Sequence, residues 1–435
     1  MENSNTPWAP LRSGAFRALW LAMSAASAGA AMQLVGAQWL ISGGSTGRSD
    51  TGLLVALVQA ASMLPVLLLG LPAGVLADLV DRRRLLIGVQ LAIAVVGLVL
   101  AGLALNGRVA STTLIVLQCA IGAGAALTMP AFGSITPDLV PRRHLPHASA
   151  LGAISTNVVR AVGPAVAGLV IAWAGTAAVF ALHAVTVLVF VGVLFAWRPC
   201  PVLARKRAME RRPEPFGAAL RVGCGYVRRT PVVRRILGQA LLFLLPGSAL
   251  LALLPLLAGQ RLGLGVNGYG LLLGALGAGA VVGALIQPRL RAVRPRDRIA
   301  GSAGVFLLAL VVVAASRDAR LVALVLVAAG AAWVITLACT NSAIESHLPA
   351  WVRARGLSVY QVVLFGTQGL GAIAWGCCAQ RLGAQAALML AAAGVGAAAL
   401  IGRAWPMHDP APATATAPAP APATAAAPVP VPVPA

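Results

Sequence analysis

Charge is scarce in this chain, and negative charge is the scarcest. Only 10% of the 435 residues are charged, and 11 acidic residues stand against 33 lysines and arginines. Soluble domains carry roughly 25% charged residues, whereas 59% of this chain is hydrophobic. A water-soluble protein of this length could not bury so much apolar surface, so the composition excludes a soluble globular fold.

Residue patterns for catalysis, metals and nucleotides are also lacking. The six cysteines show no metal-ligand spacing, and we interpret them as free thiols. The chain contains no Walker loop to hold the phosphates of ATP. It also shows no nucleophile, metal cluster or pair of carboxylates that would suggest a membrane enzyme. The sequence therefore predicts a protein that is not an enzyme and that holds no metal or cofactor.

What the chain does contain is long apolar runs. A helix that spans a membrane needs roughly 20 apolar residues, and only helices or closed barrels satisfy their backbone hydrogen bonds in lipid. The runs are longer than barrel strands and do not alternate apolar with polar residues, which favours helices. We predict an all-α polytopic membrane protein with twelve transmembrane helices, at 16–42, 52–77, 85–105, 111–137, 148–174, 176–197, 232–258, 268–288, 299–316, 320–346, 355–379 and 384–404. The weakest separations between these spans are at 174–176 and 379–384.

The positive charge is distributed in a way that predicts the topology. A net charge of +22 would suggest a nucleic-acid partner in a soluble protein, but here the basic residues lie between the apolar runs. If both termini are cytoplasmic, 26 lysines and arginines lie on the inner side, 6 lie on the outer side and Arg160 lies inside a span. Because loops rich in Lys and Arg stay on the cytoplasmic side, we predict a multi-pass protein of the cytoplasmic (cell inner) membrane. Both termini are expected inside, and no nucleic-acid partner is expected.

The same pattern divides the chain into five segments. A cytoplasmic N-terminus (1–15) precedes an N-terminal six-helix bundle (16–197), a basic connector (198–231), a C-terminal six-helix bundle (232–404) and a tail (405–435). The connector is predicted to contain an amphipathic helix whose arginines bind anionic lipid headgroups. The tail is rich in Pro and Ala, so we predict that it is disordered and cytoplasmic.

The two bundles resemble each other in sequence. A shift of 208 residues superposes four pairs of identical residues: Ser134 and Ser342, Pro141 and Pro349, Gly163 and Gly371, and Gly168 and Gly376. Each coincidence is weak in a glycine-rich chain, but together they predict two pseudo-symmetric bundles of six helices. In transporters built from such repeats, the substrate site lies between the halves.

The segment LPAGVLADLVDRRRLL, at 71–86, joins the second and third spans. It resembles the hallmark loop of the major facilitator superfamily. The matching residues are Gly74, Leu76, Ala77, Asp78, Arg82 and Arg83. Asp81 departs from the pattern, because the family usually has glycine there. The resemblance implies the major facilitator fold and a cytoplasmic latch that holds the two halves together.

The resemblance also implies roles for the charged residues of this latch. Asp78 would lie at the N-terminal dipole of the helix that forms the eleventh span, and Arg82 would pair with Asp138. Gly74 would allow close approach of helices. The alternative is that these charges only flank helices and set the topology.

The second half carries a degenerate counterpart of this loop. By the internal repeat, Arg291 or Arg289 would meet Glu345 at the inner end of the tenth span, as Arg82 meets Asp138. We therefore count Arg291 and Glu345 among the predicted latch residues.

The fifth span carries the sequence GPAVAG at 163–168. Its Gly163, Pro164 and Gly168 are similar to the Gly-Pro-x-x-Gly-Gly element of superfamily antiporters that export substrate, with Ala167 in place of one glycine. A tightly packed helix is the alternative interpretation. The wider run at 136–168 resembles the branch labelled transmembrane secretion effectors, which includes the enterobactin exporter, and the resemblance covers roughly residues 10–405. It implies export but does not identify the substrate.

Polar side chains inside the spans are candidates for a substrate cavity. The candidates are Gln33, Gln38, Asn157, Arg160 and Asn341, with Gln361 and Gln368 as weaker ones. An arginine at membrane depth costs at least about 2.5 kcal/mol unless it faces water or a counter-charge. Arg160 would therefore recognise an anionic or polar substrate, or pair structurally with Asp138. Polar residues in spans also serve simply as contacts between helices.

Together these observations lead to one main hypothesis. We expect a secondary-active transporter that exports a small organic molecule, siderophore-like or drug-like, by alternating access and with coupling to protons. No acidic residue lies near the middle of any predicted span, so no proton carrier is evident. The alternatives are an importer with the same fold and a membrane scaffold that transports nothing. The expected partners are the substrate and the lipid bilayer, and a monomer is expected.

Overall fold

The computed structural model describes residues 8–44, 51–197, 225–348 and 353–404. These ranges contain eleven long α-helices, three short 3₁₀ helices and no strand. The long helices are α1 (Gly14–Gly44), α2 (Thr51–Leu79), α3 (Arg82–Leu105), α4 (Ser111–Leu139), α5 (Leu145–Ala196), α8 (Pro231–Gln260), α9 (Val266–Ile286), α10 (Pro295–Ala315), α11 (Ala319–His347), α12 (Arg353–Leu382) and α13 (Ala384–Ala404). The tail and all but the last few residues of the predicted connector lie outside the described residues.

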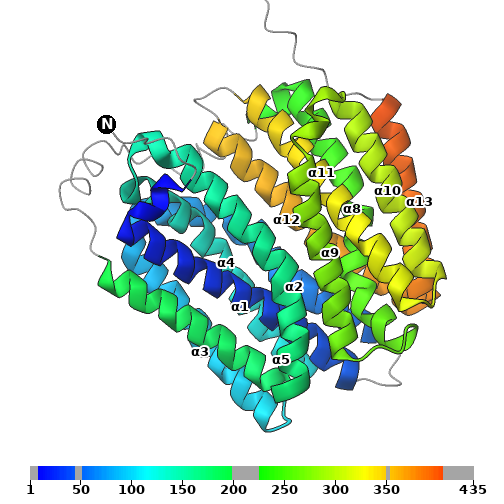
Figure 1. Ribbon diagram of the computed structural model, residues 1–435, viewed down its shortest axis with the longest axis horizontal. Coiled ribbons are helices and arrows are strands. Elements are labelled where there is room, and N and C mark those ends of the chain that lie inside the picture. Colours follow the sequence, from blue (N-terminus) through cyan, green and yellow to red (C-terminus); the bar gives the residue numbers. More distant parts are fainter. Residues whose placement is uncertain (1–7, 45–50, 198–224, 349–352, 405–435) are drawn as a thin grey trace, which may run out of the picture.

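The helix α5 contains two of the predicted spans. Its 52 residues would extend about 78 Å at 1.5 Å per residue, far more than a hydrocarbon core of about 30 Å. The helical geometry breaks at Gly175, where φ is 79° and ψ is 173°, and Figure 1 shows that the chain reverses there. Counted this way, the described helices supply twelve membrane spans, as the sequence predicts.

A second reversal is equally short. Only Gly383, with φ at 85°, separates the end of α12 from the start of α13. A positive φ is costly for residues with a Cβ atom but not for glycine. The two weakest separations in the sequence are therefore turns made by single glycines.

The helices form two halves, α1 to α5 and α8 to α13 (Figure 1). In the first half α2 packs on α4, and α3 packs on both α4 and α5; in the second half α9 packs on α11, and α10 packs on α11 and α13. Across the boundary α2 packs on α12, and α5 packs on α9. The two halves thus repeat the same pairings, which is the pseudo-symmetric arrangement that the sequence repeat predicts.

The repeated glycines make equivalent contacts in the two halves. A Cβ atom on Gly163 would lie 3.1 Å from Cβ of Ala31 on α1, and one on Gly371 would meet Ser248 on α8, the first helix of the second half. The next pair of repeated glycines lies five residues further on. Gly168 faces α9 and Gly376 faces α2, and each of these helices belongs to the opposite half. Small residues at both positions let these helix backbones approach closely.

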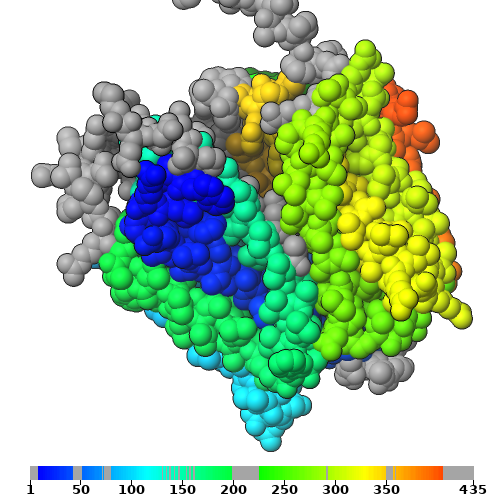
Figure 2. All heavy atoms as spheres, in the orientation of Figure 1, coloured from blue at the N-terminus to red at the C-terminus, as the bar shows by residue number. Residues whose placement is uncertain are grey.

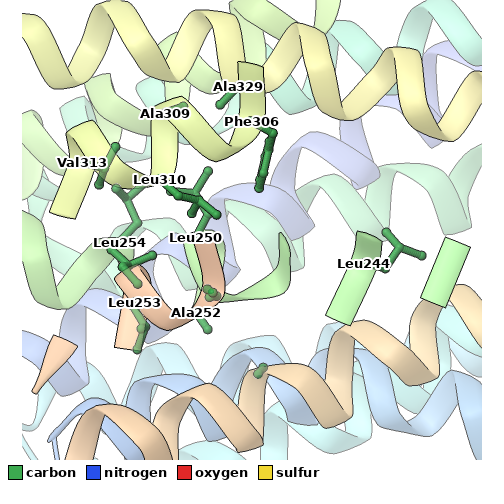
Figure 3. Close-up of a cluster of buried hydrophobic side chains, with 14 of the residues drawn as sticks. Leu244, Leu250, Ala252, Leu253, Leu254, Phe306, Ala309, Leu310, Val313 and Ala329 are labelled. Atoms are coloured by element: carbon green, nitrogen blue, oxygen red, sulfur yellow. The ribbon is translucent and has the colours of Figure 1, made fainter. Parts of the chain in front are cut away.

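The most continuous core lies around α8. Nearly every residue of this helix from Pro246 to Ala258 is buried, as expected for a helix that is apolar on all sides. Figure 3 shows Leu250 and Leu254 of α8 beside Leu310 of α10. The core of the second half therefore holds α8 firmly among its neighbours.

The bundle has two ends. The terminal end is where α1 begins and α13 ends, and the far end is where α5 reverses at Gly175 (Figure 1). Arg83 fixes the terminal end of the first half, because its Nε donates to the Leu194 carbonyl at 2.7 Å and an amino group donates to the Phe195 carbonyl at 2.8 Å. These bonds satisfy carbonyls that the last turn of α5 leaves free.

Candidate functional site

A cavity of about 250 Å³ lies between the two halves. The first half contributes lining residues from α1, α2 and α5, and the second half contributes them from α8 to α12. Most of the lining is apolar; the polar side chains among the described lining residues are Gln38, Gln59, Gln368, Tyr269 and Trp333. The site is therefore an apolar chamber with a few groups able to form hydrogen bonds, which is typical of small-molecule sites.

The cavity lies at middle depth in the bundle. Leu337 on α11 and Leu364 on α12 both line it, and each is 18 residues from the far end of its helix. Pro164 lines it too, 11 residues before the reversal at Gly175. At 1.5 Å per residue these positions lie about 16 to 27 Å from the far end.

The floor of the cavity, towards the far end, is a chain of hydrogen bonds across the two halves. The Tyr269 hydroxyl on α9 donates to Oε1 of Gln38 on α1 at 2.7 Å, and Nε2 of Gln38 donates to Oε1 of Gln59 on α2 at 2.9 Å. Tyr269 is fully buried, and its ring stacks on Trp39 with 6.2 Å between centroids. These residues together close the cavity at this end.

One wall of the cavity is aromatic and belongs to the second half. Phe306 on α10 and Trp333 on α11 both line the cavity, with ring centroids 5.7 Å apart. Phe243 lies behind them, 5.4 and 5.6 Å from the two rings. Gly247 of α8 makes room for the indole, since a Cβ atom there would lie 2.8 Å from the Trp333 ring.

At the level of the floor, glycines close the contact between α5 and α9. A Cβ atom on Gly270 would lie 2.9 Å from both Cα of Gly168 and the carbonyl oxygen of Pro164. A Cβ atom on Gly168 would lie 3.1 Å from the Val266 carbonyl oxygen. In Figure 2 the spheres of α5 and α9 touch near the far end and separate towards the terminal end. The halves thus meet most closely on this side below the cavity.

The pair α2 and α12 closes the opposite side. Gly52 on α2 faces Ala379 of α12 and Leu256 of α8 near the far end, and Gly376 of α12 faces Ala56. Further along α2, a Cβ atom on Gly70 would lie 3.5 Å from the Val362 side chain. Contacts between α2 and α12 therefore continue past the level of the cavity.

The structure separates the two glutamines predicted on the first span. Gln38 lines the cavity, whereas Gln33 is fully buried and donates from Nε2 to Oε1 of Gln118 on α4 at 2.8 Å. Gln118 in turn donates to Ser62 at 2.6 Å. Gln33 is not among the described residues that line the cavity; its bond joins helices inside the first half.

Of the remaining predicted cavity residues, the structure describes the side chains of some and not of others. Asn341 is half-buried on α11, one turn beyond Leu337, which lines the cavity. Asn157 and Arg160 lie on α5 before Pro164, and their side chains lie outside the described residues. Of the two weaker candidates on α12, Gln368 lines the cavity and Gln361 is exposed.

The export-like element of α5 contacts both α1 and α9. Gly163 faces α1, Pro164 lines the cavity, and Gly168 forms the close contact with α9. The element therefore borders both the cavity and the boundary between the halves.

The predicted latch residues all lie at the terminal end of their helices. Asp78 is in the last turn of α2, Arg82 begins α3, Asp138 is in the last turn of α4, and Glu345 is in the last turn of α11. Gly74 is on α2 and Arg291 is in the 3₁₀ helix Arg289–Ala292. The side chains of Asp78, Asp138 and Arg291 lie outside the described residues, so their pairing stays a prediction.

The departure of this loop from the family pattern has a local explanation. Asp81 caps α3, because its carboxylate accepts a hydrogen bond from the backbone N–H of Arg84 at 2.9 Å. Aspartate is among the preferred residues at this position of a helix.

Several cavity residues were not predicted from the sequence. Gln59, Tyr269, Phe306 and Trp333 line the cavity but carry no motif. A polar residue inside the second span was the only available signal for Gln59. The aromatic residues look like ordinary core residues until the fold brings α9, α10 and α11 to one wall.

Twelve membrane spans in two similar halves, with a cavity at middle depth between them, define a membrane transporter of the major facilitator superfamily. Solved structures share this fold. A bacterial homologue of the human lysosomal transporter Spinster, in an inward-facing and occupied conformation, matches with a TM-score of 0.69 and 15% identity over 92% of this chain and 98% of that protein. The nucleoside transporter NupG matches with a TM-score of 0.65 and 13% identity over 89% of this chain and 98% of that protein. At such low identities the likeness concerns the fold alone.

Within this superfamily, the chain belongs to the transmembrane secretion effector family, whose model matches residues 5–427. It is similar to macrolide efflux protein A of Streptococcus pyogenes, with 28% identity over 124 residues, which are 28% of this chain and 31% of that protein. The protein of the same name from Enterococcus faecalis is 30% identical over 116 residues, 27% of this chain and 36% of that protein. The chain thus matches about a third of the length of these curated relatives.

Proposed function

We propose that this protein exports a small organic molecule across the cytoplasmic membrane by alternating access, with protons as the coupling ion. The observation that carries the proposal is the cavity at middle depth, whose lining comes from both halves. Such a cavity changes its accessible side when the halves rock about it. The family and the efflux relatives support export as the direction.

The arrangement of closures supports a state that opens towards the terminal end on the side of α5 and α9 (Figure 2). The floor at Gln38 and Tyr269 and the contact of Gly168 with Gly270 close the cavity towards the far end. The bias of 26 basic residues against 6 argues that the terminal end faces the cytoplasm. An exporter in this state is ready to take its substrate from the cell.

The latch belongs to the same proposal. Closing the terminal end would bring Asp78 of α2 towards the start of α12, and Arg82 would pair with Asp138. The positions of these residues at one end of the bundle support this role. The latch would then hold the opposite state, in which the far end is open.

The substrate class is limited by the size and lining of the cavity. Its volume of about 250 Å³ is slightly below the 300–1,000 Å³ that is typical of drug-sized ligands. A macrolide, the compound named for the two efflux relatives, would need a wider cavity than this state provides. We therefore propose compact, drug-like molecules as substrates.

Inside-out membrane vesicles test the direction and the coupling. When the vesicle interior is acidified, a panel of labelled compact drug-like compounds and erythromycin are compared for uptake, and the compact compounds are expected to accumulate. A protonophore should abolish this accumulation. Uptake into right-side-out vesicles, driven by inward proton flow, would instead show an importer. Vesicles from cells that lack the protein serve as the inactive control, and vesicles with the exposed variant Gly259→Ala serve as the active one.

A further inference from the structure

The floor of the cavity can exchange its hydrogen bonds with a bound molecule. Both atoms of the bond between the Tyr269 hydroxyl and Gln38 Oε1 belong to residues that line the cavity. The same bond joins α9 in one half to α1 in the other. A molecule in the cavity therefore lies next to a contact that must break before the far end opens.

Breaking this bond without a replacement is costly. Tyr269 is fully buried and Gln38 is only 3% exposed, so neither partner contacts bulk water while the bond is intact. A buried donor or acceptor that loses its partner bears the full penalty of its desolvation. The empty transporter is therefore expected to keep its far end closed.

A ligand with the right chemistry removes this penalty. A carbonyl oxygen can accept the hydrogen of the Tyr269 hydroxyl, and an amide N–H can donate to the oxygen that Gln38 then has free. Gln38 keeps its own donation to Gln59 at 2.9 Å throughout. The exchange leaves every polar group of the floor paired while the halves lose their direct bond.

The aromatic wall determines where the rest of the ligand lies. Phe306 and Trp333 line the cavity with their rings 5.7 Å apart, and Phe243 supports both from behind. Aromatic pairs prefer offset or edge-to-face arrangements at about 4.5 to 7 Å between centroids. A flat ring of the ligand can extend this cluster from the side that faces the cavity.

We propose that the substrate is an aromatic molecule with a neutral amide group that carries an N–H, and that this group unlocks the far end by replacing the bond between Tyr269 and Gln38. The ring binds the wall of Phe306 and Trp333. Tyr269 then recognises the polar group of the substrate by donating a hydrogen bond to its carbonyl oxygen. The inference rests on the proposed transport function, and it adds a substrate class and a trigger.

The test uses two matched probes and a direct measure of the far end. The probes are 2-naphthamide and 2-isopropylnaphthalene, which have the same ring and similar size but differ in the amide. Spin labels at Arg108→Cys and Arg317→Cys, two exposed far-end positions in opposite halves, report the distance between the halves. The full-length chain, with its native cysteines replaced, is measured in lipid nanodiscs with each tritiated probe bound.

In the otherwise unchanged labelled protein, 2-naphthamide is expected to raise the population of long label distances about fivefold, which corresponds to one net hydrogen bond. The hydrocarbon should bind the same wall and leave the distances unchanged. In Tyr269→Phe the long distances should be populated already without ligand, and the amide should add little. Gln38→Met should behave in the same way, so a folding defect in one variant does not decide the result.

Tyr360→Phe is the matched control. Tyr360 is a buried tyrosine whose hydroxyl pairs with Thr340 at 3.0 Å inside the second half, so its loss should leave the far end and the response to the amide unchanged. An equal response to both probes, or a normal response to the amide in Tyr269→Phe, would overturn the proposal. Failure of the amide to bind would do so too. Transport into vesicles is measured separately. The export proposal can therefore fail while the amide still opens the far end, and export can be confirmed while the amide leaves the far end closed.

Discussion

Replacing Gly270 by alanine should push the two halves apart at the far end. Alanine adds a Cβ atom that would lie 2.9 Å from Cα of Gly168 and 2.9 Å from the carbonyl oxygen of Pro164. Both neighbours are backbone atoms of α5, so no flexible side chain can move aside. The helices α5 and α9 must therefore separate by several tenths of an ångström before the methyl group fits.

The size of the effect follows from this clash. Extra methyl groups in well-packed contacts typically cost about 1 to 3 kcal/mol, and the cost applies only to the state in which α5 and α9 touch. Each 1.4 kcal/mol is a factor of ten, so the population of the far-end-open state should rise about 5- to 150-fold. The better helix propensity of alanine, worth about 1 kcal/mol, acts equally on both states and cancels.

The label pair at Arg108→Cys and Arg317→Cys measures this population without any ligand. Gly270→Ala should shift the distance distribution towards longer values, and Gly259→Ala should not. Gly259 is an exposed position on α8 near the far end where an added Cβ meets nothing within 4 Å. If the two variants gave the same distribution, the contact between Gly168 and Gly270 would not be what holds the far end closed.

Three further changes test other parts of the structure. Gly175→Ala should lower the free energy of unfolding by about 1 to 3 kcal/mol, because φ 79° with ψ 173° is a region that is essentially restricted to glycine. Thermal unfolding in detergent measures this change. Gly192→Ala is the control, because a Cβ atom on this helical residue would meet nothing within 4 Å. Arg261→Ala should lower the unfolding temperature, since the guanidinium donates to the Ala315 carbonyl at 2.7 Å and to the Ser316 carbonyl at 3.2 Å. Hydrogen bonds to a charged group contribute about 1.5 to 3 kcal/mol. An unchanged unfolding temperature would contradict this prediction. Asp78→Asn should strongly impair transport in vesicles while membrane insertion, followed by immunoblot, stays normal; normal turnover would remove the latch assignment.

The number and positions of the helices could be predicted from the sequence because the physics is local. A run of roughly 20 apolar residues is decided by the bilayer and needs no knowledge of distant contacts. Even the reversal within α5 was predicted at 174–176, where Gly175 lies. The shared fold of the two halves was also predicted, since Gly163 and Gly371 occupy equivalent contacts.

The cavity could be predicted only in part because it depends on which face of a helix meets the other half. Gln33 and Gln38 are five residues apart, so at 100° per residue they point about 140° apart around α1. They could not both face the cavity; Gln38 does, and Gln33 bonds to Gln118 instead. The contact between Gln38 and Tyr269 spans 231 residues, and no local pattern indicates it.

The sequence contains a further signal for helix packing. Gly122 on α4 and Gly330 on α11 are separated by the same 208 residues as the other repeat pairs. Each faces a backbone carbonyl of the second helix of its own half, Ala61 on α2 and Leu276 on α9. Further pairs at this shift would have indicated which helices approach most closely.

The two single-glycine reversals are themselves such a pair, because Gly383 follows Gly175 by 208 residues. A turn of a single residue leaves the two helices that it joins little freedom to move separately. When one of them tilts, the other must therefore tilt as well. The last two spans of each half should therefore move together, because the same short turn joins them in both halves. Inserting a few flexible residues at either turn would let one helix tilt without the other. The motion of the two halves would then no longer be coupled to the release of substrate from the cavity.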